Sequence, residues 1–440
     1  MTEAAMNLES VNVHSNEPIE SSKLLDSPLS RRGFVTKGMA IVGLGSVLPA
    51  AFIRAAFAEG PPPTALTTSK RRALVVLQLG GGNDGLNTVI PFSDGAYYDA
   101  RPRIAVSAES ALKLNGSVGL HPGMTGMKGL YDAGNLAIVQ GVGYPNPNRS
   151  HFRSMEIWHT ASTKENVPTG WLGRFLDATK YEQQSMWRGA NIGSELPQSY
   201  ASAHSFVPSL NSPQTYGLQM DGSVRGQTQR RTMDWVQLYA QQASMGGALA
   251  LLSETGTEAY ESTVALKAAT ATYQAKATYP GNALGTALKT AAQLITSNLG
   301  MGVCYVTTGG FDTHAAESGT QANLLKATSD AIAAFYADLT AQGLSNDVLT
   351  MTWTEFGRRV KENGSQGTDH GTAGPVFLVG GGIKGGLYGE TPSVRNLDSN
   401  GDLKFNIDFR SVYSTVLSRW FGTDPKDVLG TAFPELPIFA

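Results

Sequence analysis

The feature that most constrains this fold is a set of short apolar runs, each ending in glycine or polar residues. The first run, Ala73–Leu79, precedes a glycine cluster, and similar runs cover 136–140, 302–307, 348–353 and 376–379. Apolar runs of this length are typical of strands that are buried on both faces, because such strands have no solvent-facing side. They predict the central strands of an α/β sheet.

Helical patterns lie between these runs. Residues 323–342 contain no glycine or proline and carry apolar side chains at helical spacing, and residues 235–299 are also helix-rich. Alternating strands and helices predict a doubly wound, mostly parallel sheet with helices on both faces. Residues 185–232 have weak periodicity and many Ser, Gly, Gln and Pro residues, so we expect them to form an insertion over the active-site face.

The N-terminus carries an export signal of the twin-arginine type. Arg31 and Arg32 precede a moderately apolar, Gly/Ala-rich stretch, which ends near small residues at Ala56–Ala58. We expect residues 1–58 to be a disordered leader and a signal peptide that the Tat translocase recognises and that is cleaved after Ala58; an uncleaved anchor is the alternative. The stretch is too short for a stable membrane span. The sequence therefore predicts a periplasmic or otherwise exported chain, with one α/β domain over residues 59–440.

The composition argues against a nucleic-acid partner and excludes an intramolecular disulfide. The 34 basic and 36 acidic side chains give a net charge of −2, which provides no electrostatic footprint for nucleic acid. Cys304 is the single cysteine, so no intramolecular disulfide can form. Because Cys304 lies within an apolar run, we expect it to be a buried hydrophobic residue.

Polar residues collect beside the predicted strand ends. In open α/β sheets, ligands bind outside the carboxyl ends of the strands. Carboxylates and imidazoles without thiolates are donors for a divalent ion, with zinc favoured and manganese, magnesium or calcium as alternatives. The sequence therefore predicts a site for one or two metal ions. Its expected ligands are Asp84, Asp312, His314, Glu355 and His370.

Each of these fragments also has a simpler structural explanation. Asp84 could cap a helix. The Asp312–His314 segment could form a hydrogen-bonded turn, and Glu355 with Arg358 could be a helical ion pair. Their shared position at strand ends favours the metal site.

Ser150 is the candidate nucleophile. The segment from Arg149 to Trp158 looks like the start of a helix, where backbone N–H groups favour an anion and help to ionise a hydroxyl. Arg149 and Arg153 would bind the remaining anionic oxygens of a substrate. The alternative is that Ser150 is an ordinary N-cap and that both arginines are solvated.

Beyond the leader, five segments stand out: LVVLQLGGGNDGLNTVIPF, NRSHFRSMEIWHT, GGFDTHAAE, TEFGRRVKENGSQGTDHGTAGPVFLVGGGIKGGLYG and DFRSVYSTVLSRWFG. Together with the leader they resemble the DUF1501 family of exported bacterial proteins, over nearly all of the mature chain. That family is similar in fold to the alkaline phosphatase and sulfatase superfamily, which has a doubly wound α/β sheet and a two-metal site.

This resemblance implies roles for individual residues. Asp312, His314 and His370 resemble the ligands of the first metal. Glu355 resembles the carboxylate of the second metal, and Asp84 resembles the ligand that bridges toward the nucleophile.

Ser150 resembles the nucleophile of the superfamily. Phe356 follows Glu355 where a histidine would complete the second metal, so the number of ions stays open at one or two. The resemblance implies an exported metal-dependent hydrolase that uses a serine nucleophile on small anionic phosphate or sulfate esters. The alternative is a non-catalytic periplasmic binding or assembly protein that keeps the fold. The sequence leaves the oligomeric state open.

Overall fold

The computed structural model describes residues 72–179, 187–203, 205, 207–217, 234, 237, 260, 263–297 and 299–439. The predicted leader and signal peptide, residues 1–58, lie outside the described residues. None of the helices in these ranges is long and apolar enough to cross a membrane.

A nine-stranded sheet forms the centre of the described domain. Its middle strand β1 (Ala73–Leu79) is buried along its whole length, as the apolar run predicts. Strand β1 pairs in parallel with β8 (Val303–Thr308) on one side and with β9 (Val348–Trp353) on the other. The other strands of this sheet are β5 (Leu136–Gly143), β6 (Gly189–Ile192), β7 (Ser209–Leu210), β10 (Gly374–Gly380), β11 (Gly386–Tyr388) and β12 (Ile407–Asp408).

One strand runs against the others. The main path through the sheet is β11-β5-β10-β9-β1-β8-β6-β7, and β12 pairs with β5. Strand β10 is antiparallel to both of its neighbours, β5 and β9, whereas the remaining pairs are parallel. The predicted α/β fold with a mostly parallel sheet is therefore confirmed. A separate small sheet contains β2 (Val89–Ile90), β3 (Leu112–Lys113) and β4 (Gly119–Leu120).

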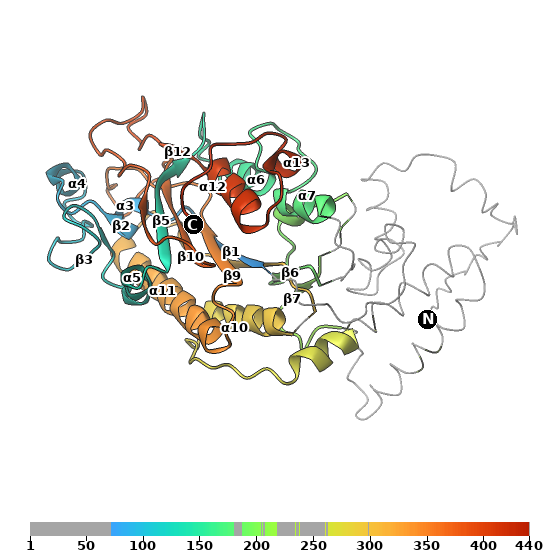
Figure 1. Ribbon diagram of the computed structural model, residues 1–440. Helices are drawn as coiled ribbons and strands as arrows, with labels where there is room; N and C mark the ends of the chain where they lie inside the picture. The colour runs from blue at the N-terminus through green and yellow to red at the C-terminus, as the bar shows by residue number, and fades with distance from the viewer. Residues whose placement is uncertain are drawn as a thin grey trace, which may run out of the picture. The chain divides into compact units, whose positions relative to one another are not determined.

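Helices cover both faces of the large sheet (Figure 1). Side chains alternate along β1, so Val75 and Leu77 join one core cluster while Leu74 and Val76 join another. The first cluster includes α5 (Thr125–Asp132), α10 (Ala283–Thr296) and α11 (Glu317–Ala341); the second includes α6 (His151–Thr160), α7 (Trp171–Ala178), α12 (Phe409–Thr415) and α13 (Pro425–Leu429). Shorter elements are α3 (Gly85–Thr88), α4 (Gly95–Ala100), a 3₁₀ turn (Gln198–Tyr200) and a π-helical turn (Val416–Trp420).

Two further expectations can be placed in this framework. The helix predicted over 323–342 coincides with most of α11. The described part of segment 185–232, predicted as an insertion over the active-site face, contributes β6 and β7 to one end of the sheet, and residues 218–232 lie outside the described residues. Strand β6 is buried despite its short length, because it pairs directly with β8. Of the predicted helix-rich segment 235–299, residues 237, 260, 263–297 and 299 are described and include α10, and the rest lies outside the described residues.

Candidate metal centre

Loops from five parts of the chain meet at one edge of the sheet. Strands β1, β8 and β9 are parallel, so Gly80–Gly82, Asp312 and Glu355 follow their carboxyl ends at the same edge. Strand β5 runs in the same direction, because both β5 and β9 are antiparallel to β10. Strand β10 therefore starts where its neighbours end. This reversal brings His370, which precedes β10, to the same edge as the residues that follow the other strands.

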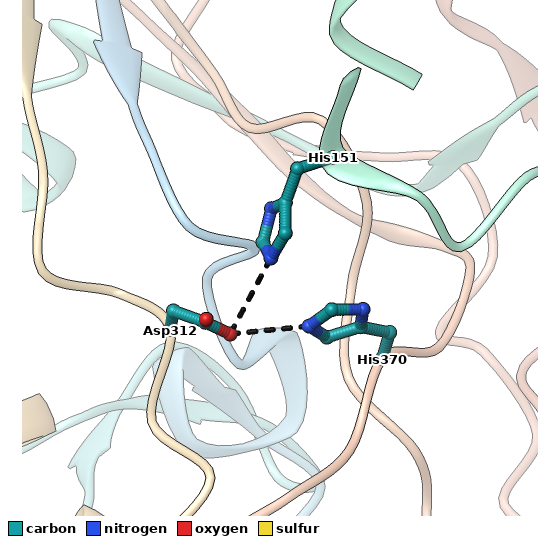
Figure 2. A group of neighbouring side chains, drawn as sticks. All are labelled: His151, Asp312 and His370. Carbon is teal, nitrogen blue, oxygen red and sulfur yellow. Dashed lines mark hydrogen bonds and ion pairs between the residues drawn. The ribbon is translucent and has the colours of Figure 1, made fainter. Parts of the chain in front are cut away.

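Asp312 lies at the centre of this edge. Its Oδ1 atom is 3.0 Å from Nε2 of His314, 3.1 Å from Nε2 of His370 and 3.5 Å from Nε2 of His151. Figure 2 shows His151 and His370 approaching the carboxylate from different segments of the chain. Three imidazoles thus present the same type of nitrogen to one carboxylate oxygen.

The second nitrogen of each imidazole has its own acceptor. Nδ1 of His151 lies 2.8 Å from Glu355 Oε1, and Nδ1 of His314 lies 3.1 Å from Asp369 Oδ1. Nδ1 of His370 lies 2.8 Å from the main-chain oxygen of Arg149. Because these acceptors hold the ring hydrogen on Nδ1, the lone pair of each Nε2 faces the cluster.

This arrangement fits a divalent metal ion. Nε2 of His314 and Nε2 of His370 are 2.9 Å apart, and two lone pairs at this distance require a proton or a cation between them. Ligands at zinc–nitrogen distances around a tetrahedral ion lie about 3.3 Å from one another. Asp312, His314 and His370 form a triangle with sides of 2.9, 3.0 and 3.1 Å, which is close to one face of such a tetrahedron.

His151 stands beside this triangle. Ligand atoms of His151, Asp312 and His370 lie within 4.8 Å of one another, so His151 can also reach a bound ion. Its contact with Asp312 is the longest of the three histidine contacts. The donor set therefore contains three close groups and a fourth that either completes the coordination or faces an open position.

Arg358 binds both Asp312 and the loops around the cluster. Its guanidinium is fully buried and donates 2.6 Å to Asp312 Oδ1. It also donates to the main-chain oxygens of Gly81, Gly82, Phe311 and Thr368, and these bonds join the loops that follow β1, β8 and β9. Burial alone would raise the pKa of Asp312, but the hydrogen bonds from Arg358 and His370, with the Arg358 charge, lower it to about 2. Asp312 is consequently an anion at neutral pH, as a metal ligand must be.

Comparison with known proteins assigns the family. A family model described as "Protein of unknown function (DUF1501)" matches residues 71–432. The chain belongs to this family. The membership expected from the sequence segments is thus confirmed, and no curated protein matches the chain.

Solved structures that are similar to this DUF1501 chain have sequences about 10% identical to it. The C-terminal periplasmic domain of EcEptC from Escherichia coli, in complex with Zn, is 10% identical, with 73% of this chain and 76% of that chain covered and a TM-score of 0.35. A protein in the alkaline phosphatase superfamily from Vibrio parahaemolyticus is 10% identical (78% and 71% covered, TM-score 0.31). The PsFucS1 sulfatase from Pseudoalteromonas sp. is 11% identical (80% and 68% covered, TM-score 0.34).

Of the five residues predicted as metal ligands, Asp312, His314 and His370 come together. Glu355 contacts His151 instead of these three residues. Its carboxylate is almost fully buried, and Oε1 interacts with Nδ1 of His151 and accepts the Gly81 N–H at 2.9 Å. Glu355 therefore orients His151, and the structure gives it no contact with the triangle itself.

Asp84 does not reach the cluster. It is fully buried at the N-cap of α3, where it accepts a bidentate pair from Arg101, with 2.9 Å between Arg101 Nη2 and Asp84 Oδ1. Burial would raise the pKa of Asp84, but Arg101 outweighs this effect and lowers it. The expected metal ligand is instead the helix cap that the sequence also allowed, and a guanidinium supplies its counter-charge.

The predicted catalytic arginines are bound within the protein. Arg149 pairs with Asp402, and Arg153 donates 2.6 Å to Glu156. Ser150 is the exposed N-cap of α6, and its hydroxyl has no hydrogen-bond partner among the described residues. The structure therefore places Ser150 beside the cluster but leaves both arginines occupied.

His151 is the site residue that the sequence did not single out. It directly follows Ser150, within the polar segment after β5, and it is the first residue of α6. A signal was present, because this histidine follows a predicted strand end just as His314 does. Its partner Glu355 is 204 residues away, so no local pattern could pair the two.

Proposed function

We propose that this protein is an exported metal-dependent hydrolase of phosphate or sulfate esters. The observation that carries the proposal is the close approach of two histidine Nε2 atoms beside Asp312, with every Nδ1 held by an acceptor. The ester class comes from the superfamily resemblance of the sequence. The compartment comes from the leader, and fractionation of cells expressing a variant with Arg31 and Arg32 both replaced by lysine tests it, since the protein should then stay in the cytoplasm.

Asp312, His314 and His370 would hold the ion, with zinc favoured by the donor set. A bound divalent ion would supply Lewis-acid polarisation of the ester and stabilise the charge that develops on it. Ser150 remains the proposed nucleophile, because its hydroxyl is exposed at the start of α6, one residue before His151. His151, held by Glu355, would lie at the open side of the triangle.

A second function has its own support. If His151 completes the coordination, four protein ligands would close the site, as in structural zinc centres. Asp84 is also paired with Arg101, so its carboxylate is not available as a ligand for a second ion. These two features favour a non-catalytic periplasmic binding or assembly protein.

Metal analysis and an ester screen separate these functions. We expect full-length protein purified from the cytoplasm to contain about one divalent ion per chain. Asp312→Ala and His370→Ala should each lose that ion. His121→Asn is the matched control, because the His121 imidazole accepts the Gly123 N–H at Nδ1 and lies outside the cluster.

The same preparation is then assayed with p-nitrophenyl phosphate, bis(p-nitrophenyl) phosphate and p-nitrophenyl sulfate. Hydrolysis of one of these that disappears in Ser150→Ala, with metal retained, supports the serine hydrolase. Bound metal without any turnover would favour the binding protein. Metal retained in both ligand variants would show that the ligand assignment is wrong.

A further inference from the structure

A hydrogen-bonded turn is linked to the candidate metal centre through Arg149, in a part of the chain that contributes no proposed ligand. Within the Asp398–Asp402 turn, Asp398 Oδ1 accepts the N–H groups of Asn400 at 2.8 Å and of Asp402 at 2.9 Å. Leu397 and Leu403 pair across the base of the turn. These bonds fix the main chain at Asp402.

The buried carboxylate of Asp402 binds the guanidinium of Arg149. Its carboxylate is fully buried, and Oδ2 accepts both Nε, at 2.8 Å, and Nη2 of Arg149. Asp398 lies 4.0 Å from the same guanidinium. A buried carboxylate that accepts two N–H groups from one arginine fixes both position and orientation.

The main chain of Arg149 carries this constraint to the cluster. Its carbonyl oxygen is the acceptor for Nδ1 of His370, at 2.8 Å. The peptide group of this carbonyl is also held, because Ser150 N donates 2.8 Å to Asn148 Oδ1, and Asn148 N in turn donates 3.0 Å to the Tyr144 hydroxyl. The carbonyl therefore cannot turn away without breaking these bonds.

A second bond joins the same turn to the other side of His370. Thr372, two residues after His370, donates its hydroxyl hydrogen to the carbonyl oxygen of Leu403. The turn thus contacts the segment that carries His370 and, through Arg149, the segment that carries His151. The described side-chain contacts of Arg149 are with Asp398 and Asp402.

We propose that Asp402 is a positioning residue for the metal centre and that it acts through Arg149. Asp402 fixes Arg149, and the Arg149 carbonyl holds the hydrogen of His370 on Nδ1, so that the Nε2 lone pair faces Asp312. Outer partners of this kind set both the tautomer and the orientation of a metal-binding histidine. The inference rests on the metal centre of the proposed function, and it changes Arg149 from a substrate-binding group into a link within the protein.

Asp402→Asn in the full-length protein tests this role. We expect zinc affinity, measured by competition with a chelator, to fall on the order of tenfold. In the metal-free protein, ¹H–¹⁵N spectra of labelled histidine should show His370 losing its fixed Nδ1–H tautomer. Glu435→Gln is the control, because it removes an exposed carboxylate from Arg419 and should change neither measurement.

The outcomes separate this inference from the proposed function. If the parent protein binds no zinc, the proposed function fails, while the tautomer of His370 still tests the link. Unchanged zinc affinity together with an unchanged tautomer in Asp402→Asn would overturn the inference. If Asp402→Asn does not fold, the double variant Asp402→Leu, Arg149→Met removes both charges of the pair, and the same two measurements decide.

Discussion

Glu355 is a carboxylate that serves the cluster through a histidine. The sequence predicted it as a metal ligand, yet Oε1 is shared between Nδ1 of His151 and the N–H of Gly81. Carboxylates in this position orient the imidazole and increase its basicity. Its effect should therefore depend on its charge as well as on its shape.

Glu355→Gln is expected to lower ester turnover by about 10- to 100-fold, because a neutral amide holds His151 less firmly. Metal content should stay the same, since Asp312, His314 and His370 make no contact with Glu355. Turnover and metal content are measured on the same preparation. Glu362→Gln, which removes another nearly buried carboxylate from Arg103, is the control. Full turnover in Glu355→Gln would contradict this role.

At the scale of elements, the glycine loop after β1 allows the other loops to approach. Gly81 has a φ of +117°, and a Cβ atom built on it would lie 2.5 Å from the main-chain nitrogen of Asp312. The loop is thus a packing surface for the segment that carries the central carboxylate. The close approach explains why the apolar run of β1 is followed by a glycine cluster.

Gly81→Ala should destabilise the fold by about 1–3 kcal/mol and displace Asp312. Gly134→Ala is the matched control, because Gly134 also has a positive φ of 77° but has open space around its Cβ position. Urea unfolding of both variants separates backbone strain from the close approach. Equal losses of stability would mean that the contact with Asp312 contributes nothing.

At the scale of the whole molecule, a buried polar network joins the first loop to α11. Glu317, at the start of α11, accepts the Thr368 hydroxyl at 2.6 Å and also hydrogen-bonds Asp84. Burial and the Asp84 carboxylate raise the pKa of Glu317 above its ordinary value of 4.5. The folded state therefore keeps a proton that the unfolded chain releases.

Stability from Glu317 should decline as the pH rises. Because the folded state binds more protons than the unfolded state, the free energy of unfolding falls between about pH 5 and pH 9. Glu317→Gln carries no such proton and should show a smaller decline, measured by urea unfolding across this range. Glu362 should change the pH dependence of stability in the opposite direction, because its pKa is lowered. Burial would raise its pKa, but hydrogen bonds from Arg103 lower it, so Glu362→Gln should alter the acidic side only. Identical pH profiles for Glu317→Gln and the parent would exclude this proton.

The strands and the long helix were predictable because burial leaves a local pattern. Apolar runs at β1, β5, β8, β9 and β10 and helical spacing in α11 are properties of neighbouring residues. Cys304 was likewise predicted to be buried, and burial raises the pKa of its thiol to about 12.

The meeting of three predicted ligands could also be expected from the sequence, because strand ends meet at one edge of a sheet. Asp312, His314 and His370 lie there as expected.

Only the tertiary structure decided the partner of each charged group. Arg101 pairs with Asp84, Asp402 pairs with Arg149, and Glu355 pairs with His151. These choices follow from loop packing and from the antiparallel direction of β10, which no residue type encodes locally. The strength of an ion pair depends on distance and burial in the folded chain, so the sequence determined which donors are present and the fold determined what each one binds.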